Sequence, residues 1–158
     1  MATDFFLRLD GINGESVATG HTNEIAIHSF SWGATQVSSV SGTGGSGAGK
    51  AHLAELSIMK TYDSASPPLF KALLNGTHIV SGLLTANMAG GDGKPYLKLT
   101  LGELFVTSIQ ASGSSEIPME SVSFSYNTIK VEYFKQDEKG VLTASGVVSY
   151  DTKANKVS

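Results

Sequence analysis

The chain contains no cysteine among its 158 residues, which excludes disulfides, thiolate metal ligands and a cysteine nucleophile. Charged residues make up only 16% of the chain and its net charge is −3, so we expect no binding to nucleic acid. No apolar run approaches the roughly 20 residues that cross a bilayer, so we expect no membrane insertion. The first residues, MATDFFLRLDG, lack the pattern of a cleaved signal peptide, and we expect synthesis in the cytoplasm as a soluble protein.

Alternation of apolar and polar residues predicts a mainly β fold, and the length predicts a single domain over residues 1–158. The alternating sets are Phe5-Leu7-Leu9, Ile25-Ile27, Leu56-Ile58, Leu97-Leu99-Leu101, Val122-Phe124-Tyr126 and Ile129-Val131-Tyr133. The alternation slips by one residue after Ile27, at Gly102-Glu103 and after Tyr126. A slip sends later side chains to the opposite face, so we expect bulged or bent strands of the kind that a small antiparallel β-barrel needs.

One segment, SPPLFKALLNG, breaks the strand pattern and predicts a short α-helix over about residues 66–75. Ser66 suits the N-cap, Pro67 suits the first helical position, and Gly76 suits the end of the helix. Leu69 and Leu73 are spaced four residues apart, which gives this helix an apolar stripe.

The run SGTGGSGAGKAH, residues 41–52, contains most of a phosphate-binding loop, because four residues separate Gly44 from Gly49-Lys50. However, Ala51 stands where that motif needs a hydroxyl to bind magnesium, and the following AHLAELSIMK alternates like a strand. A phosphate loop requires a helix at this point, because the amides of the helix N-terminus hold the phosphate. The sequence therefore favours a pliable glycine-rich loop between strands, and we expect no nucleotide or other cofactor.

No catalytic or metal-binding constellation is predicted. The four histidines, His21, His28, His52 and His78, show no close pair at metal-ligand spacing, although a site assembled in three dimensions stays open. No G-x-S-x-G elbow occurs, so a hydrolase would need a dispersed Ser-His-Asp site. Trp32 is expected to be a buried barrel aromatic.

Several stretches, taken in order, resemble the haemolysin-coregulated protein (Hcp) family, the inner-tube component of type VI secretion systems. They are FLRLDGINGES with His21, EIAIHSFSWG at residues 24–33, AGK at 48–50, DSASPPL at 63–69, AGG at 89–91 and ESVSFSYNTIKVEY at 120–133. Together they span nearly the whole chain.

The resemblance implies a compact antiparallel β-barrel with one short helix, assembled into hexameric rings that stack into a tube. It implies as partners other copies of the chain, a spike, a sheath and effector proteins held in the ring lumen. It also implies export to the outside through the type VI system, without a cleaved signal peptide and without enzymatic activity.

The same resemblance assigns the glycine-rich loop at 41–52 to ring stacking and subunit contact, through Gly42, Gly44, Gly45, Gly47, Gly49 and Lys50. It places Ser31 at a position that faces the lumen and contacts effectors. From the residues themselves, the alternation of Ser121, Ser123 and Ser125 with apolar neighbours predicts a strand with one wet face and one core face.

Two other functions stay open. One is a monomeric barrel that binds carbohydrate or another small ligand by stacking it on Trp32, Tyr62 or Tyr96. The other is the dispersed hydrolase.

Overall fold

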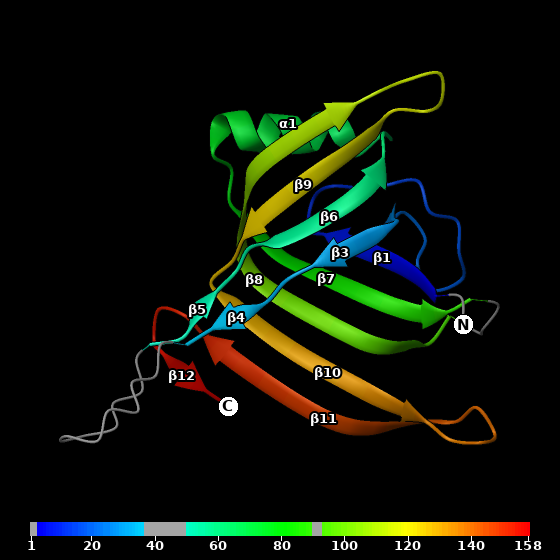
Figure 1. Cartoon of the computed structure of the whole chain (residues 1–158), viewed down its shortest axis with the longest axis vertical. Helices are drawn as coiled ribbons and strands as arrows, with labels where there is room; N and C mark the ends of the chain where they lie inside the picture. Colours follow the sequence, from blue (N-terminus) through cyan, green and yellow to red (C-terminus); the bar gives the residue numbers. More distant parts are fainter. Residues whose placement is uncertain (1–2, 37–49, 90–92) are drawn as a thin grey trace.

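The computed structural model describes residues 3–36, 50–89 and 93–158 (Figure 1). It contains one helix and twelve strands in these ranges. In chain order they are β1 (Thr3–Leu9), β2 (Ile25–Ile27), β3 (Ser29–Ser31), β4 (Ala34–Thr35), β5 (His52–Leu53), β6 (Leu56–Thr61), α1 (Ser66–Asn75), β7 (Ile79–Met88), β8 (Pro95–Ser112), β9 (Met119–Ser125), β10 (Thr128–Gln136), β11 (Leu142–Asp151) and β12 (Lys156–Val157).

The strands form one antiparallel sheet that bends back on itself, together with the small β4–β5 pair. One half has the strand order β12-β11-β10-β8-β7-β1-β2, and the other has the order β3-β6-β9-β8. β8 belongs to both halves because its first part pairs with β7 and β10 and its last part pairs with β9. Within the described residues, no ladder of hydrogen bonds joins β2 to β3, so the chain itself makes the connection there. The predicted mainly β fold with one short helix is confirmed.

The predicted slips mark the places where the chain passes from one half of the sheet to the other. Ile27 ends β2 in the first half, and two residues later β3 begins in the second half. Glu103, with a φ of 54°, lies in β8 near the switch of partners, and Leu101 and Leu104 on either side of it are both buried. A left-handed residue adds a bulge-like step, and this step returns both leucines to the core face.

The core lies between the two halves of the sheet. It is built from one face of each strand, and fully buried members include Leu7, Ile25, Ile58, Leu84 and Phe124. Since each inward position alternates with an outward one, the same strands present a second face to the outside.

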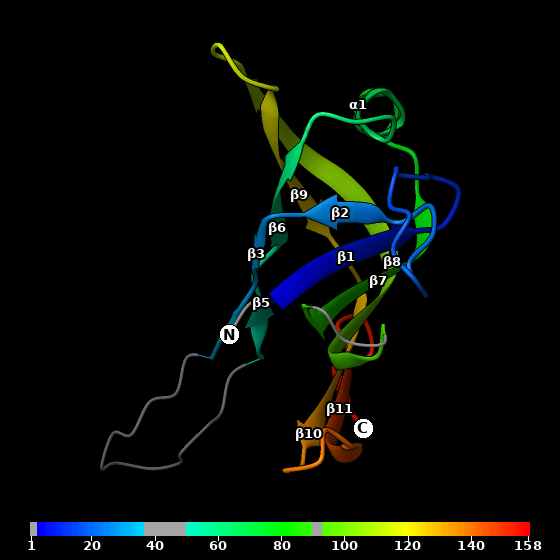
Figure 2. The same cartoon turned by 90° about the vertical axis from the view of Figure 1, so that its right-hand side faces the viewer.

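α1 packs against β8 and covers one end of the core with Leu69 and Ala72 (Figures 1 and 2). The helix ends at Gly76, whose φ of 63° is left-handed as predicted. The predicted cap at Ser66 is wrong: Ala65 is the N-cap, and no side chain caps the helix. The Ser66 hydroxyl is instead occupied by a buried ionic cluster described below.

Candidate functional site

A row of four serines crosses the outer face of the second half of the sheet. Ser31 of β3 lies opposite Ser57 of β6, Ser57 lies opposite Ser123 of β9, and Ser123 lies opposite Ser108 of β8. The hydroxyls of Ser57 and Ser123 are 2.9 Å apart and hydrogen-bonded. Because residues in register on neighbouring strands share a face, these side chains form one continuous polar line four strands wide.

A second row lies two residues along the strands and is also uncharged. Its members are Ser29, Met59, Ser121 and Gln110. We call the two rows together the serine face. Its side chains are exposed or half-buried, and no member carries a charge.

The opposite face of the same strands is apolar and explains why the serines point outward. The row between the two serine rows consists of Phe30, Ile58, Val122 and Ile109, and all four belong to or pack against the core. The wet face and core face predicted from the serine alternation are therefore both present. Ser31 lies on the wet face and is exposed.

A buried ionic cluster lies where this half of the sheet meets α1. Lys60 on β6 is fully buried, and its Nζ is 2.6 Å from Oε1 of Glu120 on β9, which is 2% exposed. The same Nζ is 2.8 Å from Oδ1 of Asp63 and donates to Oγ of Ser66 at 2.9 Å. The Ser66 hydroxyl donates to Glu120 at 2.5 Å. The cluster therefore joins two strands to the first residue of α1.

This cluster was not predicted from the sequence, although the sequence contains a signal for it. Lys60 follows Leu56 and Ile58 at period two, and Glu120 precedes Val122 in the same way. Lys60 and Glu120 thus fall at core-facing positions of their strands. When two such strands are neighbours, opposite charges at these positions predict a buried ion pair.

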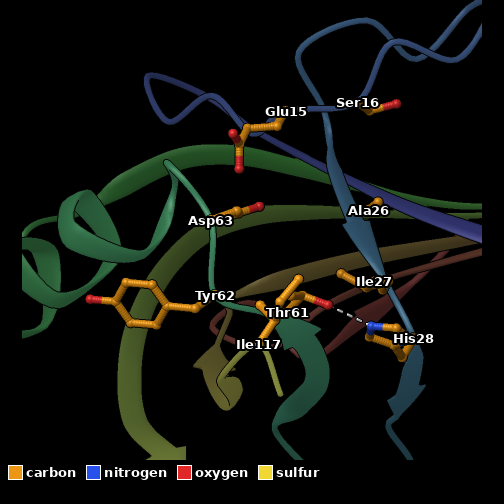
Figure 3. Close-up of a pocket in the computed structure, with 9 residues that line it drawn as sticks. All are labelled: Glu15, Ser16, Ala26, Ile27, His28, Thr61, Tyr62, Asp63 and Ile117. Atoms are coloured by element: carbon orange, nitrogen blue, oxygen red, sulfur yellow. Dashed lines mark hydrogen bonds between the residues drawn. The ribbon is translucent and has the colours of Figure 1, made fainter. Parts of the chain in front are cut away.

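A cavity of about 420 Å³, lined in part by Asp63 of the cluster, opens beside it (Figure 3). In it, Nε2 of His28 and Oγ1 of Thr61 are 2.8 Å apart. Among the residues that the structure describes, no carboxylate is seen to bond the His28 ring, so this pair lacks the third group that orients a catalytic base. Glu15 accepts from the Ser64 amide at 3.2 Å, which gives it a structural role in the same cavity.

The histidines lie apart from one another. His21 is buried, stacks on Phe6 and contacts Glu24, whereas His78 lies against the ring of Phe105. Over residues 3–36, 50–89 and 93–158, no three His, Asp or Glu side chains gather in a way that would hold a metal ion. No helix within these ranges is long and apolar enough to cross a bilayer.

The three aromatics proposed as stacking platforms do not converge. Trp32 is 36% exposed, so its expected burial in the barrel is wrong; it follows β3 and lies near the start of β6. Tyr62 follows the other end of β6, about 20 Å away at 3.3 Å per residue, and points away from His28 (Figure 3). Tyr96 is the second residue of β8, and its hydroxyl donates to Oγ1 of Thr3. These positions build no common surface for a small ligand.

The glycine-rich loop lies almost wholly outside the described residues. Gly42, Gly44, Gly45, Gly47 and Gly49 all fall in this part of the chain, and only Lys50, which is exposed, is described. The loop connects β4 to β5, and Thr35 pairs with His52 on its two sides. The chain after Lys50 enters strands β5 and β6 as predicted, so no helix is present to complete a phosphate-binding loop.

Tyr126, which follows β9, binds the backbone just before the start of β6. The Tyr126 hydroxyl donates to the carbonyl oxygen of Ala54 at 2.8 Å. Burial raises the pKa of this phenol above its ordinary value, so it stays protonated and keeps donating at neutral pH.

Comparison with known proteins gives a consistent result. The family model described as "Type VI secretion system effector, Hcp" matches residues 6–133. Protein hcp1 of Pseudomonas aeruginosa is 35% identical over 143 residues, which cover 89% of this chain and 88% of that protein. A solved structure of a type six secretion system protein superposes with a TM-score of 0.92 at 30% identity, covering 99% of this chain and all of the other. The crystal structure of Hcp1 from Salmonella typhimurium gives a TM-score of 0.81 at 35% identity, with both chains fully covered. The chain therefore belongs to the Hcp family, the secreted, tube-forming proteins of the type VI secretion system.

Proposed function

We propose that the serine face lines the lumen of a ring of copies of this chain, and that it contacts effector proteins carried there. The serine row itself supports the proposal most directly, because a hydroxyl line four strands wide serves neither the core nor a metal site. Ser31 is the proposed effector contact, since it is exposed and lies at the edge of this line. An uncharged hydroxyl surface offers hydrogen bonds to a cargo without selecting for its charge.

The proposed assembly is a hexameric ring, and rings stack through the loop at 41–52. A loop sequence with five glycines offers few apolar side chains for a core, which supports a role in contacts between rings. In this proposal the spike and sheath of the secretion system are the other partners. The protein is made in the cytoplasm, leaves through the secretion system without a cleaved signal peptide, and catalyses no reaction.

The first experiment is negative-stain microscopy and sedimentation velocity of the purified chain over a range of concentrations. We expect rings with an open centre. Because the chain has no cysteine, Ser31→Cys supplies a single thiol for a small gold cluster. Gold at the centre of the rings is the expected result, and gold at the rim would overturn the lumen assignment. A strict monomer at all concentrations would overturn the assembly.

Deletion of residues 44–49 tests the stacking role of the loop. We expect tubes to shorten or disappear while single rings and the unfolding midpoint of the subunit are retained. If the deletion instead unfolds the isolated subunit, the loop serves the fold and its assignment to stacking is wrong.

A further inference from the structure

The row of the sheet next to the serine face places a threonine opposite a methionine. Thr61 of β6 lies opposite Met119 of β9, and the Thr61 hydroxyl donates to Sδ of Met119 at 3.7 Å. Both side chains are half-buried. Met59, two residues before Thr61, shares its face of β6 and is 38% exposed. Two methionines therefore lie on this face of the sheet, one on each of two paired strands.

Met59 and Met119 are diagonal neighbours. Met59 lies opposite Ser121, and Met119 lies two residues before Ser121 on β9. Diagonal positions on paired strands are roughly 7–8 Å apart, a distance that two long side chains can close. A methionine side chain has three rotatable bonds, so its sulfur can adjust to a partner. The two sulfur atoms can therefore meet at one point.

His28 brings a ring nitrogen to the same place. Its backbone amide donates to the carbonyl oxygen of Met59 at 2.7 Å, which fixes this residue beside β6. Its Nε2 lies 2.8 Å from Oγ1 of Thr61 (Figure 3). The Thr61 hydroxyl is thus a partner both of the His28 ring and of the Met119 sulfur. An imidazole nitrogen and a thioether sulfur are directed at a single atom.

A cavity gives solutes access to this place. Its volume is about 610 Å³, and its lining includes His28, Thr61, Met119 and Glu116. Apart from the titratable His28, Glu116 is the only charged side chain in the lining, among the residues that the structure describes. The carboxylate of Glu116 favours the entry of cations over that of anions.

We propose that His28, Met59 and Met119 bind a soft monovalent cation, of which Cu(I) is the biological example. We call these three residues the thioether site. Thioether sulfur selects Cu(I) and imidazole suits copper, whereas Mg²⁺ and Ca²⁺ prefer oxygen ligands. On binding, bonds from the cation to Nε2 of His28 and Sδ of Met119 replace the two hydrogen bonds of the Thr61 hydroxyl. All three ligands come from one subunit, so the inference goes beyond the proposed function and does not depend on ring assembly.

Titration of the purified chain with silver nitrate in a chloride-free buffer tests the site, because Ag(I) accepts the same soft ligands and keeps its oxidation state. NMR of ¹³C-labelled methionine methyl groups reports each sulfur separately, and methionine-to-leucine variants assign the signals. We expect the signals of Met59 and Met119 to move and to saturate at one Ag(I) per subunit. Met88, the last residue of β7, is the internal control, and its signal should stay in place.

Substitution of the ligands measures what each contributes. Met59→Leu, Met119→Leu and His28→Gln each remove one ligand at a position that is exposed or half-buried, and circular dichroism establishes that each variant is folded. Competition with a chromogenic Cu(I) chelator, with ascorbate and without oxygen, gives the affinity. We expect each variant to bind roughly tenfold more weakly or worse, since loss of even an outer partner of a metal ligand costs about that much. The matched controls Met88→Leu and His52→Gln should bind like the wild type.

Three results would overturn the proposal. One is a Met88 signal that moves as much as those of Met59 and Met119, which would show adventitious binding only. Another is an unchanged affinity in the three ligand variants. The third is tighter binding of Zn(II) than of Cu(I), because the argument from thioether ligands would then fail. A chain that binds Ag(I) at this site but forms no rings would refute the proposed function and leave this inference standing, so the two failures are distinguishable.

Discussion

Replacing Lys60 by methionine should destabilise the subunit strongly. The Lys60 ammonium is the only cation in a buried cluster with Glu120 and Asp63, among the contacts that the structure describes. Methionine fills a similar volume but supplies no charge. The carboxylate of Glu120, 2% exposed, would keep only the Ser66 hydroxyl as a partner. Asp63 lies nearer the surface, with 13% of its side chain exposed, and its carboxylate has an easier route to water.

The expected cost follows from which charge is left behind. Removing one member of a buried ion pair typically costs about 3–5 kcal/mol, because the remaining ion stays desolvated. Since domains of this kind unfold with roughly 5–15 kcal/mol, Lys60→Met should remove a large part of the stability. The double variant Lys60→Met/Glu120→Leu removes both central ions and should be close to the wild type or more stable, within about 2 kcal/mol.

Urea unfolding at neutral pH measures these differences. All variants must be compared at one protein concentration below that of ring assembly, because assembly adds its own stability. With a slope of roughly 1–3 kcal/mol per molar urea, a loss of this size shifts the midpoint by more than about 1 M. A shift of Lys60→Met below about 0.5 M would refute the reasoning, and so would a double variant less stable than either single one.

Two further predictions use the backbone and the surface. Gly14→Ala should lower the free energy of unfolding in urea by roughly 1–3 kcal/mol, because the added Cβ would lie 2.5 Å from the backbone oxygen of Glu24. Gly33→Ala is the control: its Cβ would meet nothing within 4 Å, so stability should change by less than about 0.5 kcal/mol. Equal effects of the two substitutions would contradict this prediction. Lys153 lowers the pKa of the Glu103 carboxyl below its ordinary value through a hydrogen bond of 2.9 Å. The pair therefore stabilises the fold at pH values above the ordinary pKa of glutamate. This contribution is lost as the pH falls through the lowered pKa. Lys153→Met should raise the pKa of Glu103 in an NMR titration while changing stability at neutral pH only slightly, since both side chains are exposed; an unchanged pKa would show that the pair does not form in solution.

The sequence predicted the strands and the helix because both depend on local periodicity. The alternation around Val122 and Phe124 follows from one strand having a core face and a wet face, and Gly76 ends α1 through its own backbone preference. The slip at Gly102-Glu103 was readable for the same reason, since a bulge-like step changes the phase of a single strand.

The sequence did not predict what depends on partners distant along the chain. The serine row needs the register of three strand pairs, and the pairing of Ser31 with Ser57 appears nowhere in the local pattern. Ser66 was assigned to capping because its preference for N-caps is local, and the nearby Lys60-Glu120 pair overrides that preference. Trp32 was expected inside because aromatic residues usually are, but it follows the last residue of β3, where the chain leaves the core.

In the proposed lumen, the hydroxyls of the serine face also influence how fast an effector protein leaves. A hydroxyl turns about a single bond and exchanges donor for acceptor roles, so the wall can rearrange its hydrogen bonds without moving the backbone. A groove lined with carboxylates or guanidinium groups would bind an oppositely charged effector tightly and release it slowly. The neutral hydroxyls of Ser57 and Ser123 offer weak, interchangeable hydrogen bonds, so the proposed lumen would let an effector pass through more readily than it would retain it.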